Sequence, residues 1–125
     1  MLNRRFAEHP IARRCHRYYS RTMELTPIVS ALSALAQLTR LRCYLMLRQD
    51  GEKTAGELAS ALGVPANTMS SHLTILGTAG LVTSTRNGRN IIYRSEVARL
   101  AELAEFLDML VSERTVNSAE RPAKG

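Results

Sequence analysis

Apolar residues recur at helical spacing through most of the chain after its first two dozen residues. Ile28, Leu32 and Leu35 stand at i, i+4 and i+7, which predicts a first helix that presents them on one face. A second helix is expected over about residues 39–48, because residues 50–51 are an Asp-Gly pair with turn chemistry. The chain therefore begins its periodic part with two helices in close succession.

The pattern next predicts two short helices joined by a tight turn. Thr54 and Glu57 have the spacing of a capping box, in which each side chain satisfies the other residue's backbone N–H. Gly63 suits the left-handed position that ends such a helix. Pro65 fits the first position of the following helix, because that position needs no N–H. The inward positions of this fourth helix are apolar and share helical spacing: Met69, Leu73 and Leu76.

The period then changes from helical to alternating. Two short strands are expected at residues 81–86 and 90–94, and the pair Asn87-Gly88 between them is a strong hairpin signal. A last helix follows over about residues 96–114, with one apolar stripe. This order predicts a mainly α fold with a small β-hairpin wing, an α+β arrangement known as a winged helix-turn-helix.

Composition divides the chain into three parts. Residues 1–22 contain six arginines and one acid, and we expect a disordered basic arm, or an extension upstream of a natural start at Met23 rather than Met1. A short helix packed on the domain is the less favoured alternative, and a transit peptide has no apolar face to support it. Residues 23–114 form the predicted domain, and residues 115–125 a polar tail.

Apolar segments are too short for a membrane protein. No run approaches the roughly 20 residues that a bilayer-spanning helix needs, and the start has no signal-peptide core. The sequence therefore predicts a soluble, cytoplasmic protein with no membrane partner.

The distribution of charge is more informative than its sum. The net charge of +6 is concentrated in residues 1–22, which alone carry +5. By contrast, no Asp or Glu occurs between Glu57 and Glu96. Because phosphates repel carboxylates at close range, an acid-free surface of this length favours contact with DNA.

The acid-free stretch carries the residue types that read duplex DNA. The major groove admits an α-helix, and short polar side chains let that helix approach base edges. Asn67 is suited to adenine and the Ala66 methyl to a thymine methyl. The hairpin tip is expected to reach an adjacent minor groove or phosphate strand. The predicted DNA-binding residues are Ala66, Asn67, Thr68, Ser70, Ser71, Thr74, Arg86, Asn87 and Arg89.

Several separate motifs add a resemblance to this interpretation. They read Ala34-Leu35-Ala36-Gln37-Leu38-Thr39-Arg40-Leu41-Arg42, Gly56-Glu57-Leu58-Ala59, Val64-Pro65-Ala66-Asn67-Thr68-Met69-Ser70-Ser71-His72-Leu73, Ala79-Gly80-Leu81-Val82 and Gly88-Arg89-Asn90-Ile91-Ile92-Tyr93. Together they cover about half of the chain and resemble the ArsR/SmtB family of metal- and ligand-responsive repressors. The resemblance implies a homodimer joined by its first and last helices, with recognition helices in successive major grooves. It also implies release of DNA when an inducer binds.

Dimer formation is also expected from the last helix itself. Its apolar stripe needs cover that a domain of this size does not supply from within. A two-fold dimer would read double-stranded DNA as an imperfect palindrome, with half-sites roughly 10 base pairs apart or a multiple of that.

The metal sites that the resemblance implies are not matched. Residues 52–58, which correspond to the thiolate sensor of the third helix, contain no cysteine. The predicted last helix has carboxylates but neither His nor Cys, and residues 112–115 supply no thiol. His72 is expected to pack beside the recognition face and not to bind a ligand. We therefore predict no metal and no cofactor, and a signal that is an organic ligand, a redox change or a partner protein, or constitutive binding.

Two cysteines leave one alternative open. Cys43 shares a helical face with Met46 and Leu47, which predicts a small buried hydrophobe. Cys15 lies among arginines, which favour a reactive thiolate. The alternative function is therefore a thiol sensor of arsenite or of redox state, formed by Cys15 and Cys43 of two subunits.

Two other classes of function compete with a regulator. A winged-helix protein-interaction module is the first, but such modules often carry acids on the recognition face, and residues 58–95 have none. An enzyme is the second, but no nucleophile–base pair or metal cluster can be composed from these residues. The sequence thus predicts a sequence-specific, homodimeric DNA-binding repressor that is not an enzyme, released from its operator by an unidentified inducer.

Overall fold

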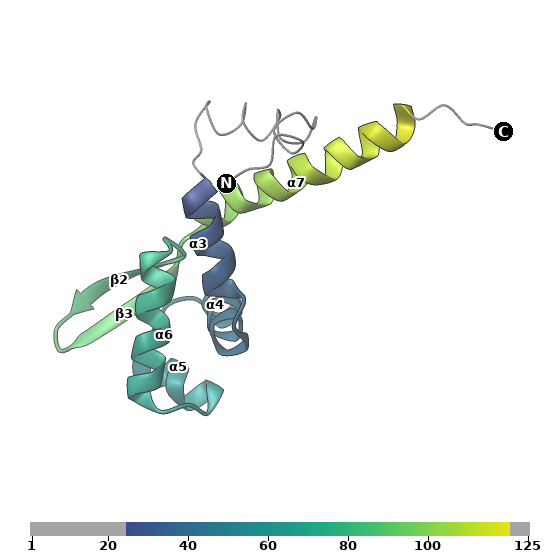
Figure 1. Ribbon diagram of the computed structural model, residues 1–125. Coiled ribbons are helices and arrows are strands. Elements are labelled where there is room, and N and C mark those ends of the chain that lie inside the picture. The colour runs from purple at the N-terminus through teal and green to yellow at the C-terminus, as the bar shows by residue number, and fades with distance from the viewer. Residues whose placement is uncertain (1–24, 121–125) are drawn as a thin grey trace.

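Residues 25–120 are described by the computed structural model, with side chains described for residues 25–112 (Figure 1). The expected basic arm at residues 1–22, the alternative start at Met23 and the thiol of Cys15 lie outside the described residues, as do residues 121–125 of the expected tail. The described elements are, in chain order, α3 (Leu25–Leu35), α4 (Leu38–Asp50), β1 (Lys53–Thr54), α5 (Ala55–Leu62), α6 (Ala66–Thr78), β2 (Val82–Asn87), β3 (Asn90–Ser95) and α7 (Val97–Glu120).

The strands form a small antiparallel sheet in the order β1-β3-β2. Strands β2 and β3 make the predicted hairpin, which projects from the helices beside α6 (Figure 1). Strand β1 pairs Lys53 with Tyr93 and Thr54 with Ile92. Sequence analysis missed β1, because two residues are too few to show an alternating pattern. Thr54 therefore has two roles, since it ends β1 and also caps α5.

The tip of the hairpin corrects one local expectation. Asn87 pairs with Asn90, so the two turn residues are Gly88 and Arg89 and not the predicted pair Asn87-Gly88. Gly88 has φ +63°. A positive φ at the first turn position alone is the pattern of a type II′ turn, which selects glycine there.

The helix ends follow the predicted capping chemistry with two corrections. The capping box is confirmed, since Glu57 N donates to Thr54 Oγ1 at 3.2 Å and Thr54 N donates to Glu57 Oε1 at 3.1 Å. Gly63 ends α5 with φ +67°, as predicted. Pro65 is the cap of α6 and not its first residue, because its ψ of 149° is extended.

The last helix also ends later than expected. It continues to Glu120, so the first part of the predicted polar tail is helical. Residues 115–120 contain neither Gly nor Pro, and the next helix-breaking residue is Pro122. A polar composition alone therefore did not mark the end of α7.

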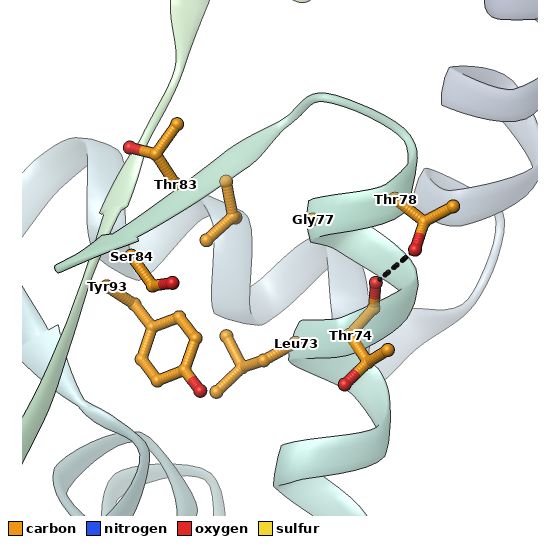
Figure 2. A pocket seen from close by; sticks show the side chains of 8 residues that line it. Leu73, Thr74, Gly77, Thr78, Thr83, Ser84 and Tyr93 are labelled. Carbon is orange, nitrogen blue, oxygen red and sulfur yellow. Dashed lines mark hydrogen bonds between the residues drawn. The ribbon is translucent and has the colours of Figure 1, made fainter. Parts of the chain in front are cut away.

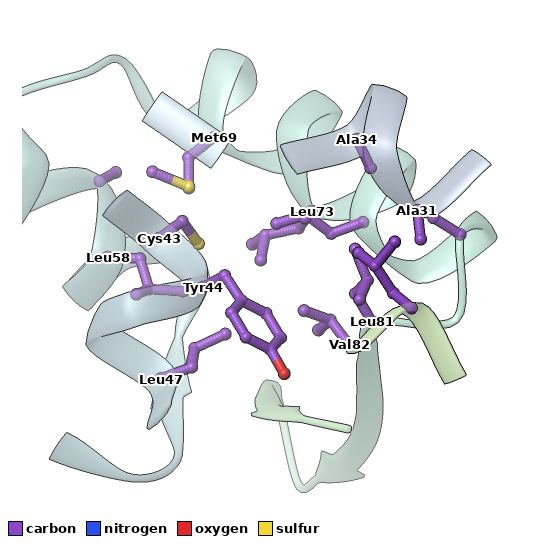
Figure 3. Close-up of a cluster of buried hydrophobic side chains, with 14 of the residues drawn as sticks. Ala31, Ala34, Cys43, Tyr44, Leu47, Leu58, Met69, Leu73, Leu81 and Val82 are labelled. Atoms are coloured by element: carbon purple, nitrogen blue, oxygen red, sulfur yellow. The ribbon is translucent and has the colours of Figure 1, made fainter. Parts of the chain in front are cut away.

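A single apolar core holds the helices against the base of the hairpin (Figure 3). Met69, Leu73 and Leu76 of α6 are buried in it, as the spacing predicts. Cys43 and Tyr44 of α4 join them from another side. The buried core also includes Ile28, Leu47, Leu58 and Leu81. Because α6 is held by one row of apolar side chains, its opposite side is left in solvent.

We expect Leu76→Ala to lower the free energy of unfolding by about 2–5 kcal/mol, because it opens a cavity in the core. Leu76 is 0% exposed, whereas its neighbour Ile75 is 44% exposed. The matched variant Ile75→Ala should therefore cost less than about 1 kcal/mol. Urea denaturation followed by circular dichroism measures both. Equal losses in the two variants would contradict the placement of α6.

Candidate nucleic-acid interface

The outer side of α6 brings six of the predicted residues together. Its exposed side chains there are Ala66, Asn67, Thr68, Ser70, Ser71 and Thr74. None is charged and none is larger than asparagine, so the helix backbone can approach a flat or grooved partner closely.

Hydrogen bonds within α6 orient these polar groups. Ser71 Oγ donates to Asn67 O at 3.2 Å, and Thr74 Oγ1 donates to Ser70 O at 2.9 Å. These hydroxyls therefore present their lone pairs outward in this conformation. The Oδ1 atom of Asn67 accepts a hydrogen bond from Thr68 N at 2.9 Å. A two-bond contact between Asn67 and a base would need Oδ1 to accept a second hydrogen bond or to give up this local one.

The hairpin carries the other three predicted residues at its far end. Arg86, Asn87 and Arg89 are all exposed. Within residues 25–112 the structure gives Arg86 and Arg89 no ion-pair partner. Arg94 differs, since it lies 3.6 Å from a carboxylate oxygen of Glu52 near the base of the hairpin. The positive charge of the wing is therefore concentrated at its tip.

A cleft of about 360 Å³ separates α6 from the hairpin (Figure 2). Its polar lining comes from both walls, with Thr74 and Thr78 on α6 and Thr83, Ser84 and Tyr93 on the strands. Of these five, sequence analysis identified only Thr74. The others belong to the site through tertiary packing, which a local pattern does not reveal.

Ile75 is a second feature that sequence analysis missed. It is an exposed apolar residue on α6, one turn after Ser71. A residue of this kind is suited to contact with a thymine methyl. Its spacing of four residues from Ser71 was the available signal. An apolar residue next to the inward row is, however, easily assigned to the core.

Arg40 of α4 links α6 to the end of α3. Its Nε donates to Ala34 O at 2.7 Å, and its Nη1 donates to His72 Nδ1 at 3.4 Å. His72 is half-buried beside the outer face of α6, as the sequence indicates. This contact fixes one flank of α6 from inside the domain.

Cys43 is fully buried, in agreement with its interpretation as a small hydrophobe. Burial raises the pKa of its thiol to about 11, which disfavours the reactive thiolate at neutral pH. Because Cys15 lies outside the described residues, the proposed pair of cysteines stays a prediction. The burial of Cys43 weighs against it.

The described residues show neither a cluster of metal ligands nor a membrane-spanning helix. Among the side chains of residues 25–112, no three His, Cys, Asp or Glu gather as ligands for a metal ion. The described helices include none that combines the length and the apolar character of a membrane span.

The helix pair α5–α6 and the adjoining hairpin define a winged helix-turn-helix protein. In agreement, a family model described as a helix-turn-helix domain matches residues 35–85. The HTH-type transcriptional regulator CmtR of Mycobacterium bovis is 37% identical over 95 residues, which are 74% of this chain and 80% of the relative. The HTH-type transcriptional repressor SmtB of Mycobacterium tuberculosis is 42% identical over 72 residues. That match spans 58% of this chain but only 53% of the relative.

Solved structures agree with these relatives. The ArsR-like transcriptional regulator from Rhodococcus sp. RHA1 superposes with a TM-score of 0.69 at 29% identity, covering 80% of this chain and 95% of that one. A homodimeric winged helix-turn-helix DNA-binding domain from Mycobacterium bovis has a TM-score of 0.58 at 29% identity, covering 71% and 82% of the two chains. The chain belongs to the ArsR/SmtB family of winged helix-turn-helix transcriptional regulators. This confirms the resemblance and places the chain among regulators rather than enzymes.

The buried thiol predicts a pH dependence of stability. The pKa of Cys43 rises from 9.0 to about 11 on folding, so between these values the unfolded chain loses a proton that the folded chain keeps. The free energy of unfolding should therefore fall as pH rises from about 9 to 11, by at most about 1.4 kcal/mol per pH unit from this group. Urea denaturation at a series of pH values measures the slope.

Cys43→Ala is the control for this slope. Burial also raises the pKa of Tyr44, with a lowering contribution from Arg48 and a further raising one from Glu96, so a shallower decline should remain in the variant. Parallel pH profiles for the two proteins would contradict the assignment to Cys43.

Proposed function

We propose that this chain is a homodimeric repressor that binds duplex DNA with α6 in the major groove and the β2–β3 hairpin as a wing. One observation carries the proposal, namely the exposed, uncharged face of α6 beside a hairpin with an arginine tip. No carboxylate interrupts this surface, since residues 58–95 contain none. The relatives named as transcriptional repressors and regulators support the same function.

The two parts of the surface have different roles. Asn67, Ser71 and the Ala66 methyl contact base edges and so determine which sequence is bound. Thr68, Ser70 and Thr74 flank them on α6. Arg86, Asn87 and Arg89 contact phosphates or the minor groove, which strengthens binding to every sequence and makes it depend on salt. The outward lone pairs of Ser71 and Thr74 suit the amino groups of adenine and cytosine.

The dimer forms through the first and last described helices, α3 and α7. These helices pack against each other at one side of the domain (Figure 1). Leu25, Val29 and Leu32 form an exposed stripe on α3, and Leu107 is 44% exposed on α7. A second copy of this chain would cover both, and the structural neighbour from Mycobacterium bovis is described as homodimeric. Two-fold symmetry then selects an imperfect palindrome as the operator.

Among the described side chains no three possible metal ligands gather, so nothing in this part of the chain supports a metal as the signal that releases the operator. An organic ligand, a redox change or a partner protein is therefore the class of inducer we propose. The site of action is the cytoplasm, where a bacterial operator is accessible.

We expect Asn67→Ala and Ser71→Ala to relax sequence specificity. Each should weaken binding to the operator by about tenfold and leave binding to unrelated DNA nearly unchanged, because a base contact is lost. Fluorescence anisotropy measures this with a duplex from upstream of the chain's own gene and a scrambled duplex, at two salt concentrations.

Arg89→Ala is the contrasting variant. It should weaken binding to both duplexes alike and reduce the slope of log affinity against log salt by about one, because it removes a phosphate contact. If the wild-type protein does not distinguish the upstream duplex from the scrambled one at either salt concentration, the proposed repressor function is wrong.

We also expect Val29→Glu to convert the dimer into a monomer, because it places a charge in the proposed interface. Val29 is 61% exposed in the single chain, so the substitution leaves the fold intact. Sedimentation equilibrium measures the mass. Leu45→Glu is the control: Leu45 is exposed on α4, which takes no part in the proposed interface, so this variant should remain dimeric. Dimers of both variants would place the interface elsewhere.

A further inference from the structure

Ser84 and Tyr93 contribute two hydroxyl groups to the strand side of the cleft between α6 and the hairpin. They are directly paired across β2 and β3, and both line the cleft. Figure 2 shows both side chains turned toward α6, with Leu73 and Thr74 opposite them. Ser84 is exposed, so the cleft is open to solvent. Tyr93 is half-buried and packs against the core, which holds its ring in place.

These two hydroxyls differ from those on the other wall. Thr74 Oγ1 donates to Ser70 O and Thr78 Oγ1 donates to Thr74 O, each at 2.9 Å. Within the described part of the chain, no partner is found for Ser84 Oγ or Tyr93 Oη. The strand wall therefore offers two O–H donors that the fold itself does not use.

The surroundings of the cleft favour an anion. None of its lining residues is acidic, and no acid occurs in residues 58–95. Arg86 follows Ser84 by two residues on the same face of β2, and its side chain is exposed. Two unused donors and a nearby positive charge, with no carboxylate, suit the oxygens of a phosphate.

We propose that a backbone phosphate of the bound DNA strand occupies this cleft and accepts hydrogen bonds from Ser84 and Tyr93. The inference rests on the proposed function and deepens it. A helix in the major groove has a phosphate strand along its flank, and a wing beyond that strand leaves the strand between the two. The base-contacting residues lie in the first half of α6, whereas Gly77 and Thr78 of the cleft lie at its end. The cleft therefore positions the protein on DNA and does not read its sequence.

Tyr93→Phe tests the proposal, because it removes one hydroxyl and keeps the ring in place. We expect binding to weaken by about tenfold for the upstream duplex and for the scrambled duplex alike. The salt slope should stay unchanged, since no charge is removed, in contrast to Arg89→Ala. Ser84→Ala should act in the same direction. Fluorescence anisotropy at several salt concentrations measures all three effects.

Two matched controls separate the cleft from general effects on folding. Tyr44→Phe removes the other described tyrosine hydroxyl of the core, which donates to Glu96 O at 3.2 Å, and it should leave DNA affinity unchanged. Thr85→Ala removes a hydroxyl on the opposite face of β2, where Thr85 pairs with Ile92, and it should also leave affinity unchanged. Circular dichroism establishes that each variant is folded.

The position of the contact is tested by replacing single phosphates with neutral methylphosphonates. At one position in each half-site the wild-type protein should lose more affinity than the Tyr93→Phe variant, because the variant has only the Ser84 hydroxyl left to lose at that phosphate. Full affinity of Tyr93→Phe for both duplexes would overturn the phosphate site and leave the repressor function intact. A loss confined to the upstream duplex would also overturn it, because the hydroxyl would then read a base. If wild-type protein binds neither duplex, the proposed function fails first and the phosphate site fails with it.

Discussion

Burial of one row of α6 is the constraint on which the rest of the structure depends. Met69, Leu73 and Leu76 enter the core, and Figure 3 shows the first two of them there. A helix that buries one row must present the opposite one to solvent. The row also sets the rotation of α6 about its axis, since a turn of even 100° would bring a polar residue into the core. The direction in which Asn67 and Ser71 point is therefore a consequence of apolar packing on the far side of the helix.

The flanks of α6 are fixed by different means. On one flank Arg40 binds both Ala34 O and His72, so the end of α3 and the side of α6 share one guanidinium. On the other flank the hairpin faces α6 across the cleft, and Leu73 reaches that cleft from the core. The same α3 carries the apolar stripe proposed for the dimer. Arg40 therefore connects the proposed dimer surface directly to α6. That proximity suits a protein whose two copies must hold α6 at a fixed spacing on DNA.

The features predicted correctly from the sequence are those that depend on local spacing. They are the capping box at Thr54 and Glu57, the left-handed Gly63 and the inward row of α6. Sequence reasoning failed where the answer depends on distant pairing. Strand β1 exists because Lys53 and Thr54 meet β3, and the turn at Gly88 and Arg89 is set by the register of Asn87 with Asn90. The cleft was missed for the same reason, since Ser84 and Tyr93 become neighbours of α6 only in the folded chain.

Overall charge would have been a poor guide to this surface. Most of the net positive charge lies in residues 1–22, outside the described domain, whereas the interface itself has few cations. What distinguishes the interface is the lack of carboxylates, together with neutral donors in the cleft and arginines at the tip. Neutral hydroxyls contribute hydrogen bonds to phosphate without releasing counterions, and arginines contribute both. In the proposed complex, part of the affinity for DNA is therefore insensitive to salt, and discrimination between sequences is left to the short polar side chains of α6.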